Sequence, residues 1–490
     1  MIKYIYIFIC ALCANGLFAQ DDRALSLDQI IELAQSESPQ VKLAEMRKSN
    51  AYWTNQSFLA DYRPQIDLGI TLPALNRSID LITLPDGSSA FRERSQMNNR
   101  LSLSLSQNIT KTGASVFAST SVSRLDIFET SLVQGSKSYL SNPLFFGFSQ
   151  PLFQFNELKW NKRIMPLVYK ESKAKFSEEL EAVAQLAVNY FFNLLNAQMD
   201  LESALARKII ADELFELGKN RYSVGNIAET DVLQLEMDAM RSNTDISRAK
   251  LQQQTANEAL RNFLGIFEAT NFNLNLPLDI PEVEVDLQKA LVESKLNRSR
   301  ILELDRILLE AEQNVERNKA ATGLNGELSG ELGVTGFGSS INDAYSSLLD
   351  QEVVTLRLTV PIADWGKSKA RYEIAKSNYD LISLNTKLER INFENEVTIA
   401  VQQFELVKEN VVLAKRSYEA SQKRYDLTRK RYMIGKVDVT QLNLADREQE
   451  SQRQAYVQSI NQFWQAYYQI RSLTLYDFME GRSLVREEVE

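Results

Sequence analysis

The chain's most informative segment reads PLFQFNELKWNKRIMPLVYKESKAKFSEELEAVAQLAVNYFFNLLNAQMDLESALARKIIADELFELGKNRYSVG, from Pro151 to Gly225. It aligns without a gap with Pro361–Gly435, because 361 − 151 and 435 − 225 both equal 210. Each copy starts with a strand that ends in a proline, continues as a long helical run and closes at a glycine turn, RYSVGN (221–226) or RYMIGK (431–436). A duplication on this scale predicts a repetitive architecture in which the chain performs its function twice.

The region before each copy also repeats, but with a different spacing. Apolar residues at intervals of three to four predict a helix from Leu27 to about Asp61, and the same pattern returns over Leu287–Ala321 at an offset of 260. The change from 260 to 210 places fifty extra residues in the first half, between its opening helix and Pro151. This insertion contains strand-like sequence, and either longer loops or additional strands would account for it.

The composition excludes several classes of protein. Of the 490 residues, 44% are hydrophobic and 24% are charged, and a mean hydropathy of −0.27 argues against a polytopic helical membrane protein. A net charge of −9, with both signs interspersed, argues against nucleic acid as a partner. The chain contains no histidine, which removes the commonest general base and the commonest zinc ligand. We therefore expect neither an enzyme nor a protein that binds a cofactor or a metal.

The N-terminus has the features of an export signal. Lys3 precedes a short apolar run, Tyr4–Cys13, which is followed by the cleavage-like sequence LFA ending at Ala19. About ten apolar residues are far fewer than the ~20 that span a bilayer, which disfavours a membrane anchor. Both cysteines of the chain lie in this run, so we expect the exported chain to contain no thiol and no disulfide.

Several stretches alternate apolar and polar residues and are typical of strands. The apolar positions of the two clearest examples are Leu101, Leu103 and Leu105 in the first half and Val354, Leu356, Leu358 and Val360 in the second. Gln65–Leu72, Gly113–Ser123 and Ser141–Phe153 follow the same pattern. Alternation gives a strand one apolar and one polar face. The apolar face could meet the core of a soluble sandwich or the lipid around an exported barrel, and the pattern alone leaves both open.

The helical runs after the two prolines are unusually long. About 65 residues from Asn156 to Tyr222 contain one proline and one glycine, so a continuous helix would be roughly 100 Å long. Apolar residues recur every seven positions, for example at Val397, Phe404 and Val411, and this repeat predicts a left-handed supercoil. A soluble coiled-coil stalk would show the same pattern.

In the order, duplication and spacing of these features, the chain resembles the TolC-type outer-membrane efflux protein family. The resemblance rests on the opening helix that ends at Tyr62-Arg63-Pro64, on the strand-to-helix junction Ser149–Phe153, on its partner Val360-Pro361-Ile362 and on the two glycine turns. It covers nearly the whole chain after the export signal. Each motif is loose by itself, but their order and spacing are specific.

The resemblance implies an α+β fold and a homotrimer. In that family, three protomers share one outer-membrane β-barrel, which continues as a periplasmic coiled-coil barrel of helices from two internal repeats. The segments expected along the chain are a signal peptide (1–19), an N-terminal periplasmic helix (20–64), a first barrel segment with the insertion (65–155), a first helical hairpin with its tip near 224–227 (156–264), an equatorial segment and helix (265–322), a second barrel segment (323–363), a second helical hairpin with its tip near 434–437 (364–476) and a C-terminal tail (477–490).

The first glycine turn resembles the corresponding family tip, where a Thr-Asp pair makes inter-helix bonds that hold the closed state. The resemblance assigns this role to Thr230 and Asp231, and it makes Tyr432 the tyrosine that bonds across. Thr and Asp are also good helix N-caps after a glycine turn, and the two roles are compatible.

The second turn departs from the family. Some members carry an arginine two positions after the glycine and aspartates six and nine positions after it, whereas this chain has Val437, Gln441 and Leu444. An apolar ring at Leu444, or acidity from Asp438 and Asp231, would substitute, and ordinary helix packing is the alternative for Leu444. The residues expected at the gate are Thr230, Asp231, Tyr432, Asp438, Gln441 and Leu444. Those expected to dock an adaptor are Tyr222, Val224, Gly225, Asn226, Ile434, Gly435 and Lys436.

Functionally, the resemblance implies a passive exit duct of a tripartite efflux or type I secretion system. It would lie in the outer membrane of a Gram-negative bacterium, in contact with outer-membrane lipid, and extend into the periplasm. The chain shows no nucleotide-binding glycine loop, so an inner-membrane pump of the RND or ABC type would supply energy through a periplasmic adaptor. A periplasmic coiled-coil adaptor or structural stalk explains the seven-residue repeat but not the strands, and an exported hydrolase lacks an evident nucleophile and base.

Overall fold

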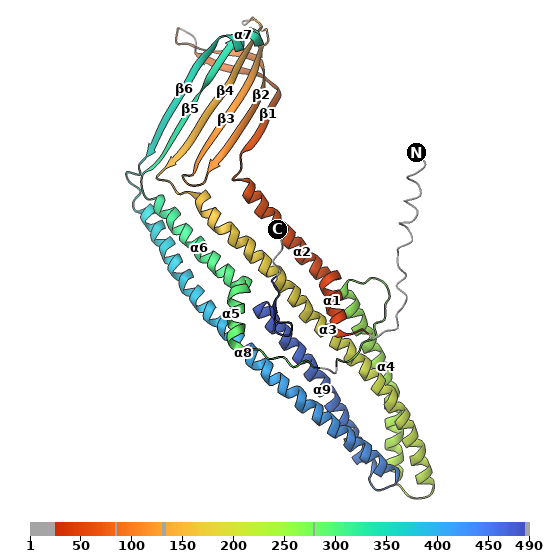
Figure 1. Ribbon diagram of the computed structural model, residues 1–490. Coiled ribbons are helices and arrows are strands. Elements are labelled where there is room, and N and C mark those ends of the chain that lie inside the picture. The colour runs from red at the N-terminus through yellow and green to blue at the C-terminus, as the bar shows by residue number, and fades with distance from the viewer. Residues whose placement is uncertain (1–24, 84–85, 130–133, 278–279, 486–490) are drawn as a thin grey trace, which may run out of the picture. The chain divides into compact units, whose positions relative to one another are not determined.

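Six antiparallel strands form one sheet, and their order in the sheet is their order along the chain (Figure 1). The strands are β1 (Gln65–Thr83), β2 (Ser89–Ile109), β3 (Ala114–Ile127), β4 (Ser136–Leu152), β5 (Asn325–Gly338) and β6 (Leu348–Thr359). A short helix, α7 (Ile341–Ser346), connects β5 to β6. This computed structural model describes residues 25–83, 86–129, 134–277 and 280–485, so the predicted signal peptide, 1–19, lies outside it. Within these residues β1 and β6 are the edges of the sheet, and each has one unpaired side.

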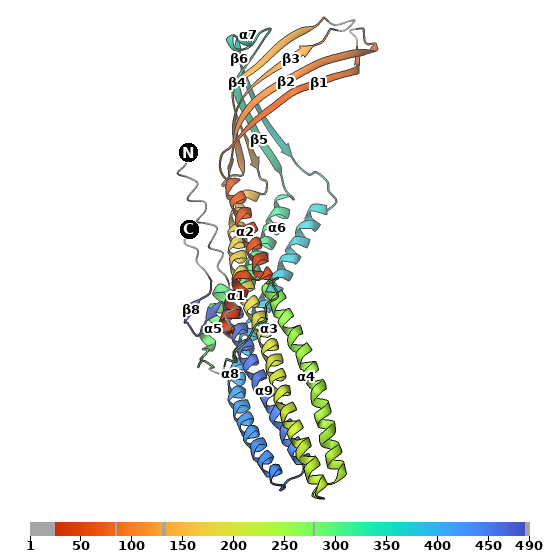
Figure 2. The same ribbon diagram turned by 90° about the vertical axis from the view of Figure 1, so that its right-hand side faces the viewer.

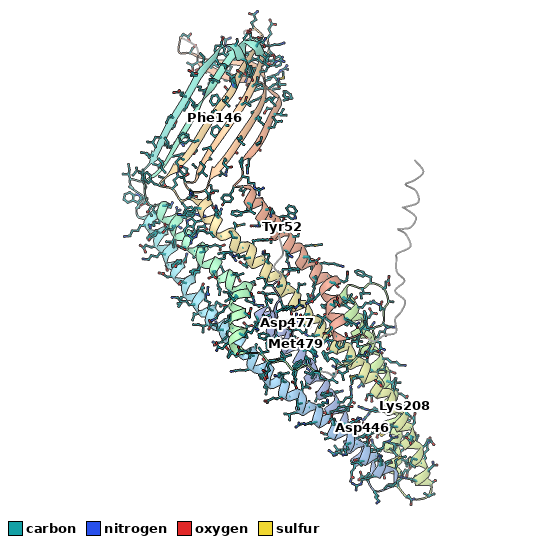
Figure 3. All side chains as sticks on the ribbon, viewed as in Figure 1. Tyr52, Phe146, Lys208, Asp446, Asp477 and Met479 are labelled. Atoms are coloured by element: carbon teal, nitrogen blue, oxygen red, sulfur yellow. The ribbon has the colours of Figure 1, made fainter. Side chains whose placement is uncertain are left out.

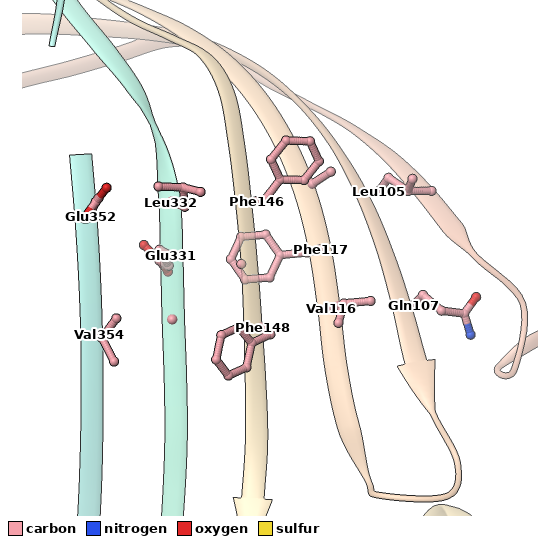
Figure 4. A pocket seen from close by; sticks show the side chains of 13 residues that line it. Leu105, Gln107, Val116, Phe117, Phe146, Phe148, Glu331, Leu332, Glu352 and Val354 are labelled. Carbon is pink, nitrogen blue, oxygen red and sulfur yellow. The ribbon is translucent and has the colours of Figure 1, made fainter. Parts of the chain in front are cut away.

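One face of the sheet is apolar from β1 to β5, and on the edge strand β6 it carries Val354, Leu356 and Leu358 next to Glu352. The strand register places Ile66, Leu105, Ala118, Phe146 and Leu332 in a single row. The same register puts both predicted apolar sets, around Leu103 and Leu356, on this face, where these two side chains are 44% and 56% exposed. The face has a hollow of about 660 Å³, partly lined by Phe146 and Phe148 (Figure 4). Because the face is exposed in a single-layered sheet (Figure 2), the soluble sandwich that the sequence left open does not form.

The other face of the sheet is rich in serine. Ser102 pairs with Ser121, and Ser104 pairs with Ser119, on the neighbouring strands β2 and β3. Large rings on this face lie flat over glycines of the neighbouring strand, as Phe117 does over Gly147. A Cβ atom on Gly147 would lie 2.3 Å from the Phe117 ring, so only glycine leaves room for it. The sheet therefore has one apolar and one polar face, as the alternation predicts.

The long helices form two hairpins. The first consists of α3 (Glu157–Ser223) and α4 (Glu229–Leu264), and the second of α8 (Lys367–Met433) and α9 (Val439–Thr474). The two outgoing helices both have 67 residues and the two return helices both have 36. The seven-residue positions of α8 point inward, and Val397, Phe404 and Val411 are all buried. None of the described helices combines the length and the apolar content that crossing a bilayer requires.

The opening helix of each half is broken, although the sequence pattern predicts a continuous one. The first half has α1 (Leu27–Glu37) and α2 (Pro39–Ala60), and the second has α5 (Leu287–Asn297) and α6 (Ser299–Ala320). The break in the first half falls at Ser38, whose ψ is 146°. A residue before proline is driven out of the helical region, and Pro39 follows directly. Apolar spacing continues across the break, which is why periodicity alone misses it.

The chain divides into two compact units, each assembled from separate stretches. The helical unit contains the described residues up to Lys48, Lys173–Arg298 and the chain from Asn392 onward. The sheet unit contains Ser49–Ser172 and Ser299–Ile391. The segments predicted along the chain follow its order, whereas each unit combines parts of several of them.

A buried ionic network closes the helical unit at the C-terminal end of α9. Arg471 binds both carboxylate oxygens of Glu181 on α3, at 2.8 and 3.0 Å, and also binds Asp477 at 2.9 Å. The hydroxyl of Tyr467 donates to the second oxygen of Asp477 at 2.6 Å. Asp477 lies in the short strand β7 (Tyr476–Asp477), which pairs with β8 (Arg482–Ser483). The network therefore ties the end of the chain to α3.

Candidate functional site at the two glycine turns

The two hairpin turns have the same backbone geometry. At the first turn, the N–H of Gly225 donates to the carbonyl of Tyr222 and the N–H of Asn226 donates to the carbonyl of Arg221, both at 2.9 Å. At the second turn, Gly435 and Lys436 donate in the same way to Tyr432 and Arg431, also at 2.9 Å. This double bond pattern is the Schellman motif, which ends a helix at a left-handed residue. Gly225 and Gly435 supply that residue, with φ of 77° and 71°. Local sequence is therefore sufficient to build each turn.

One apolar cluster joins the two hairpins just above their turns. Its buried members are Leu214 on α3, Leu235 on α4, Tyr425 and Tyr432 on α8, and Val439, Leu442 and Ala445 on α9. Gly218 of α3 also belongs to this contact, because a Cβ there would lie 2.5 Å from Leu235. All four helices contribute, so movement of one hairpin against the other disturbs a shared core.

Arg221 connects the two turns and was not assigned a role in the sequence analysis. Its guanidinium donates to the backbone carbonyls of Tyr432 and Met433, at 3.2 and 2.8 Å, and lies 5.3 Å from the centre of the Tyr432 ring. These carbonyls belong to the last turn of α8, where carbonyls lack intrahelical partners, although that of Tyr432 also accepts the N–H of Gly435. The motifs RYSVGN and RYMIGK draw attention to the arginine that precedes the tyrosine in both, but they do not indicate its acceptors.

Tyr432 and Asp231 lie close enough to interact electrostatically. Tyr432 is 4% exposed, and burial raises the pKa of its hydroxyl. The positive charge of Arg221 opposes this rise in pKa, whereas the negative charge of Asp231 adds to it. The charge of Asp231 on one turn therefore acts on the Tyr432 hydroxyl on the other, but the hydrogen bonds of the described residues include none between these two side chains.

The capping role considered for Thr230 and Asp231 is wrong. The N-cap of α4 is Ala228, which has no side-chain capping bond, and Thr230 and Asp231 are the second and third residues inside the helix. The negative charge of Asp231 in the first turn still suits the positive end of the helix dipole. At the second turn Asp438 is the N-cap, and its carboxylate accepts the backbone N–H of Gln441 at 2.8 Å.

The remaining predicted residues are exposed in the single chain. Val224 and Ile434, at the apices of the turns, are 68% and 66% exposed, and Tyr222, Asn226 and Lys436 are also exposed. Leu444 is 59% exposed, so it does not pack into the chain's own core. The apices therefore present apolar side chains outward at two equivalent turns.

A charged cavity of about 410 Å³ lies between the hairpins above the cluster. Figure 3 labels Asp446, which lines it from α9, and Lys208 on α3. Glu450 accepts from Arg453 at 2.6 Å and forms an ion pair with Arg207 at 2.5 Å, and Arg453 also pairs with Asp200. The described residues contain no group of three or more acidic, histidine or cysteine side chains placed to hold a metal ion. The ion pairs in the wall of this cavity therefore connect α3 with α9.

Stability of the helical unit should depend on the ionisation of Glu450. Burial disfavours its charge, but the hydrogen bonds from Arg453 and the charge of Arg207 outweigh burial and hold its pKa below the ordinary value. A lowered folded pKa stabilises above the unfolded pKa of about 4.3, and this contribution is lost as pH falls through the folded pKa. Glu450→Gln should therefore lower the melting midpoint at pH 7, and its deficit relative to the unmodified chain should shrink below about pH 4.

Thermal melts followed by circular dichroism at pH 7 and pH 3 measure this difference. The exposed neighbour Glu448 accepts only from Gln452 among the contacts described, so Glu448→Gln is the matched control and should leave the midpoint unchanged at both pH values. A Glu450→Gln deficit that is equally large at both pH values would contradict the role of its charge.

Comparison with known proteins identifies the family. A family model of outer membrane efflux proteins matches residues 30–266 and 297–474. The chain belongs to this family. The resemblance to TolC-type proteins inferred from the sequence is therefore confirmed. No curated protein matches the chain.

Solved structures share its fold at low sequence identity. The CmeC outer membrane channel of Campylobacter jejuni is 15% identical, with 91% of this chain and 85% of that chain covered and a TM-score of 0.64. A membrane protein from Pseudomonas aeruginosa is 16% identical, with coverage of 94% and 92% and a TM-score of 0.65. The open state of the Neisseria gonorrhoeae MtrE outer membrane channel is 15% identical, with coverage of 91% and 88% and a TM-score of 0.62.

Proposed function

We propose that three copies of the chain form an outer-membrane exit duct for a tripartite efflux or type I secretion system. The open sheet carries this proposal, because its apolar face is exposed and β1 and β6 each have an unpaired side within the described residues. Lipid suits the apolar face, but it cannot satisfy the N–H and C=O groups of an open edge. Pairing β6 of one copy with β1 of the next closes a barrel and removes both edges.

The gate of the duct lies at the two glycine turns. Asp231 and Tyr432 hold the closed state together with Arg221, while Thr230, Asp438, Gln441 and Leu444 face the opening. Leu444, with no packing partner in its own chain's core, forms an apolar ring with its copies. The duct opens when the shared cluster changes from one packing to another. An adaptor that binds the open packing more tightly shifts the equilibrium toward it.

The exposed apices are the adaptor's docking sites. Tyr222, Val224, Gly225 and Asn226 form one site, and Ile434, Gly435 and Lys436 form the other. Two similar apolar turns on each chain suit a periplasmic adaptor that binds both. The adaptor couples the duct to an inner-membrane pump of the RND or ABC type, which supplies the energy for transport.

Disulfide crosslinking between copies tests the closed barrel. The chain has no cysteine after Cys13, so introduced cysteines react without background. Leu68→Cys on β1 is combined in turn with Val354→Cys, Leu356→Cys and Leu358→Cys on β6, all on the apolar face. Oxidation of detergent-extracted outer membranes should give a ladder of dimers and trimers on a denaturing gel for at least one pair.

The control is Leu68→Cys with Leu103→Cys, which face each other within one chain and should crosslink without a ladder. If no pair gives a ladder and the chain leaves the membrane fraction without detergent, the duct is excluded in favour of the periplasmic stalk.

A further inference from the structure

The two halves of the chain differ by one β-hairpin. β1 and β5 both follow an opening helix and start 260 residues apart, at Gln65 and Asn325. β4 and β6 both lead into a long helix, and these helices start 210 residues apart, at Glu157 and Lys367. β1 therefore corresponds to β5, and β4 to β6. The fifty-residue insertion is the hairpin β2–β3, which has no counterpart in the second half.

This hairpin is built into the sheet along its length. β2, with 21 residues, pairs with β1 on one side and with β3 on the other. β3 in turn pairs with β4 from Ser115 to Ile127. The apolar row crosses the hairpin without interruption through Leu105 and Ala118. The inserted strands therefore continue both faces of the sheet.

The turn of the hairpin is held by side chains from the end of β4 and from the residue before α3. The amide of Asn156 donates to the Thr110 carbonyl at 2.9 Å, while its oxygen accepts the N–H of Lys159 and so caps α3. Gln150 donates to the Thr112 carbonyl at 3.0 Å. Gly113, with φ of 76°, would place a Cβ 3.3 Å from Asn156. Such specific contacts indicate a structural element of the sheet and not a loop laid over it.

We propose that the β2–β3 hairpin widens the exit through the outer membrane, so that the barrel does not limit the size of the cargo. This inference rests on the trimeric duct proposed above. Six strands in each of three chains give eighteen, against twelve without the hairpin. With strands about 4.8 Å apart and tilted by about 40°, the barrel is about 36 Å across between backbones, compared with about 24 Å for twelve strands.

The inner wall added by the hairpin is rich in hydroxyl groups, and three arginines of β2, Arg92, Arg94 and Arg100, lie toward its far end. From Arg100 to Asn108 on β2, and opposite them on β3, the side chains on this face are Arg100, Ser102, Ser104, Ser106, Asn108, Ser115, Phe117, Ser119, Ser121 and Ser123. Short serine side chains occupy little of the lumen and hydrogen-bond to water. The cargo class that this wall suits is a bulky, water-soluble molecule, with selection left to the gate at the turns.

Crosslinking within one chain tests whether the hairpin lies in the native barrel. Leu68→Cys should crosslink to Leu103→Cys on β2, and Ala118→Cys on β3 should crosslink to Phe146→Cys on β4, because each pair is directly opposed. A crosslink from Leu68→Cys to Leu144→Cys, Phe146→Cys or Phe148→Cys would instead show β1 paired with β4. That result would contradict the place of the β2–β3 hairpin in the barrel even if the ladder between copies still forms. The two experiments therefore test the trimeric duct and the wide barrel independently.

Labelling of intact cells tests the width. Ser104→Cys should react with maleimides carried on polymers of up to about 10 Å radius as fast as with a small maleimide, within about threefold. Leu103→Cys, which faces lipid, is the matched control and should react with neither. Polymer labelling of Ser104→Cys that is more than tenfold slower than small-maleimide labelling would overturn the wide exit.

Discussion

Replacing Arg471 with methionine should lower the free energy of unfolding of the helical unit by about 3–5 kcal/mol. The guanidinium neutralises Glu181 and Asp477, whose side chains are 5% and 4% exposed. Methionine fills most of the volume but leaves two buried carboxylates without a cation, and an uncompensated buried charge is among the most destabilising changes known in proteins. The predicted loss is large because both carboxylates lose their partner at once.

The loss should depend on pH in a defined direction. Burial already raises the pKa of Glu181, and Arg471 opposes that rise. Without Arg471 the folded pKa rises further, and a group with a raised folded pKa favours folding less as pH increases. The deficit should therefore be larger at pH 8 than at pH 5, where Glu181 can take up a proton.

Guanidinium unfolding followed by circular dichroism measures this effect. Arg482→Met is the matched control, because Arg482 pairs only with Glu480 at the surface among the contacts described and should change the midpoint very little. A midpoint for Arg471→Met equal to that of the control would show that the network contributes nothing to stability.

Replacing Arg221 with alanine should raise the open probability of the reconstituted duct about tenfold. Arg221 makes two charge-assisted bonds to the end of α8, and its guanidinium lies beside Tyr432. At a partly exposed site these contacts are worth about 1.5 kcal/mol, which corresponds to a tenfold shift between two states. The shift favours opening because the contacts join the two hairpins, and separating the hairpins breaks them.

Single-channel recording in planar bilayers measures the open probability. Lys219→Ala is the control, since Lys219 lies half a turn away on the same helix and pairs locally with Glu216. If Arg221→Ala behaves like this control in open probability and conductance, the bridge between the turns is structural and not part of the gate.

Much of the architecture follows from local pattern. The glycine turns were predictable because a Schellman ending needs only a glycine at one position. The faces of Leu103 and Leu356 were predictable because a strand alternates with a period of two. The buried row of Val397, Phe404 and Val411 follows from the seven-residue period in the same way.

The candidate site was predictable only in part. Asp231 and Tyr432 could be singled out by resemblance, and the charge of Asp231 contributes to the raised pKa of the Tyr432 hydroxyl, but their role at the gate stays a prediction. Arg221 was missed because its acceptors are backbone carbonyls of a segment 211 positions away, and carbonyls carry no sequence signature. The N-cap at Ala228 was missed because a helix can start without a side-chain cap.

By itself, the sequence determined the long helices of the hairpins, the turns and the faces of the strands, since each depends on residues near in the chain. Only the tertiary structure decided that the fifty-residue insertion is a hairpin between β1 and β4. It also decided that Arg471 meets Glu181 across 290 positions. The physical reason is that alternation states which face of a strand is apolar, but not which strand lies beside it. Partners distant in sequence are selected by the register and packing of the whole sheet and helical unit.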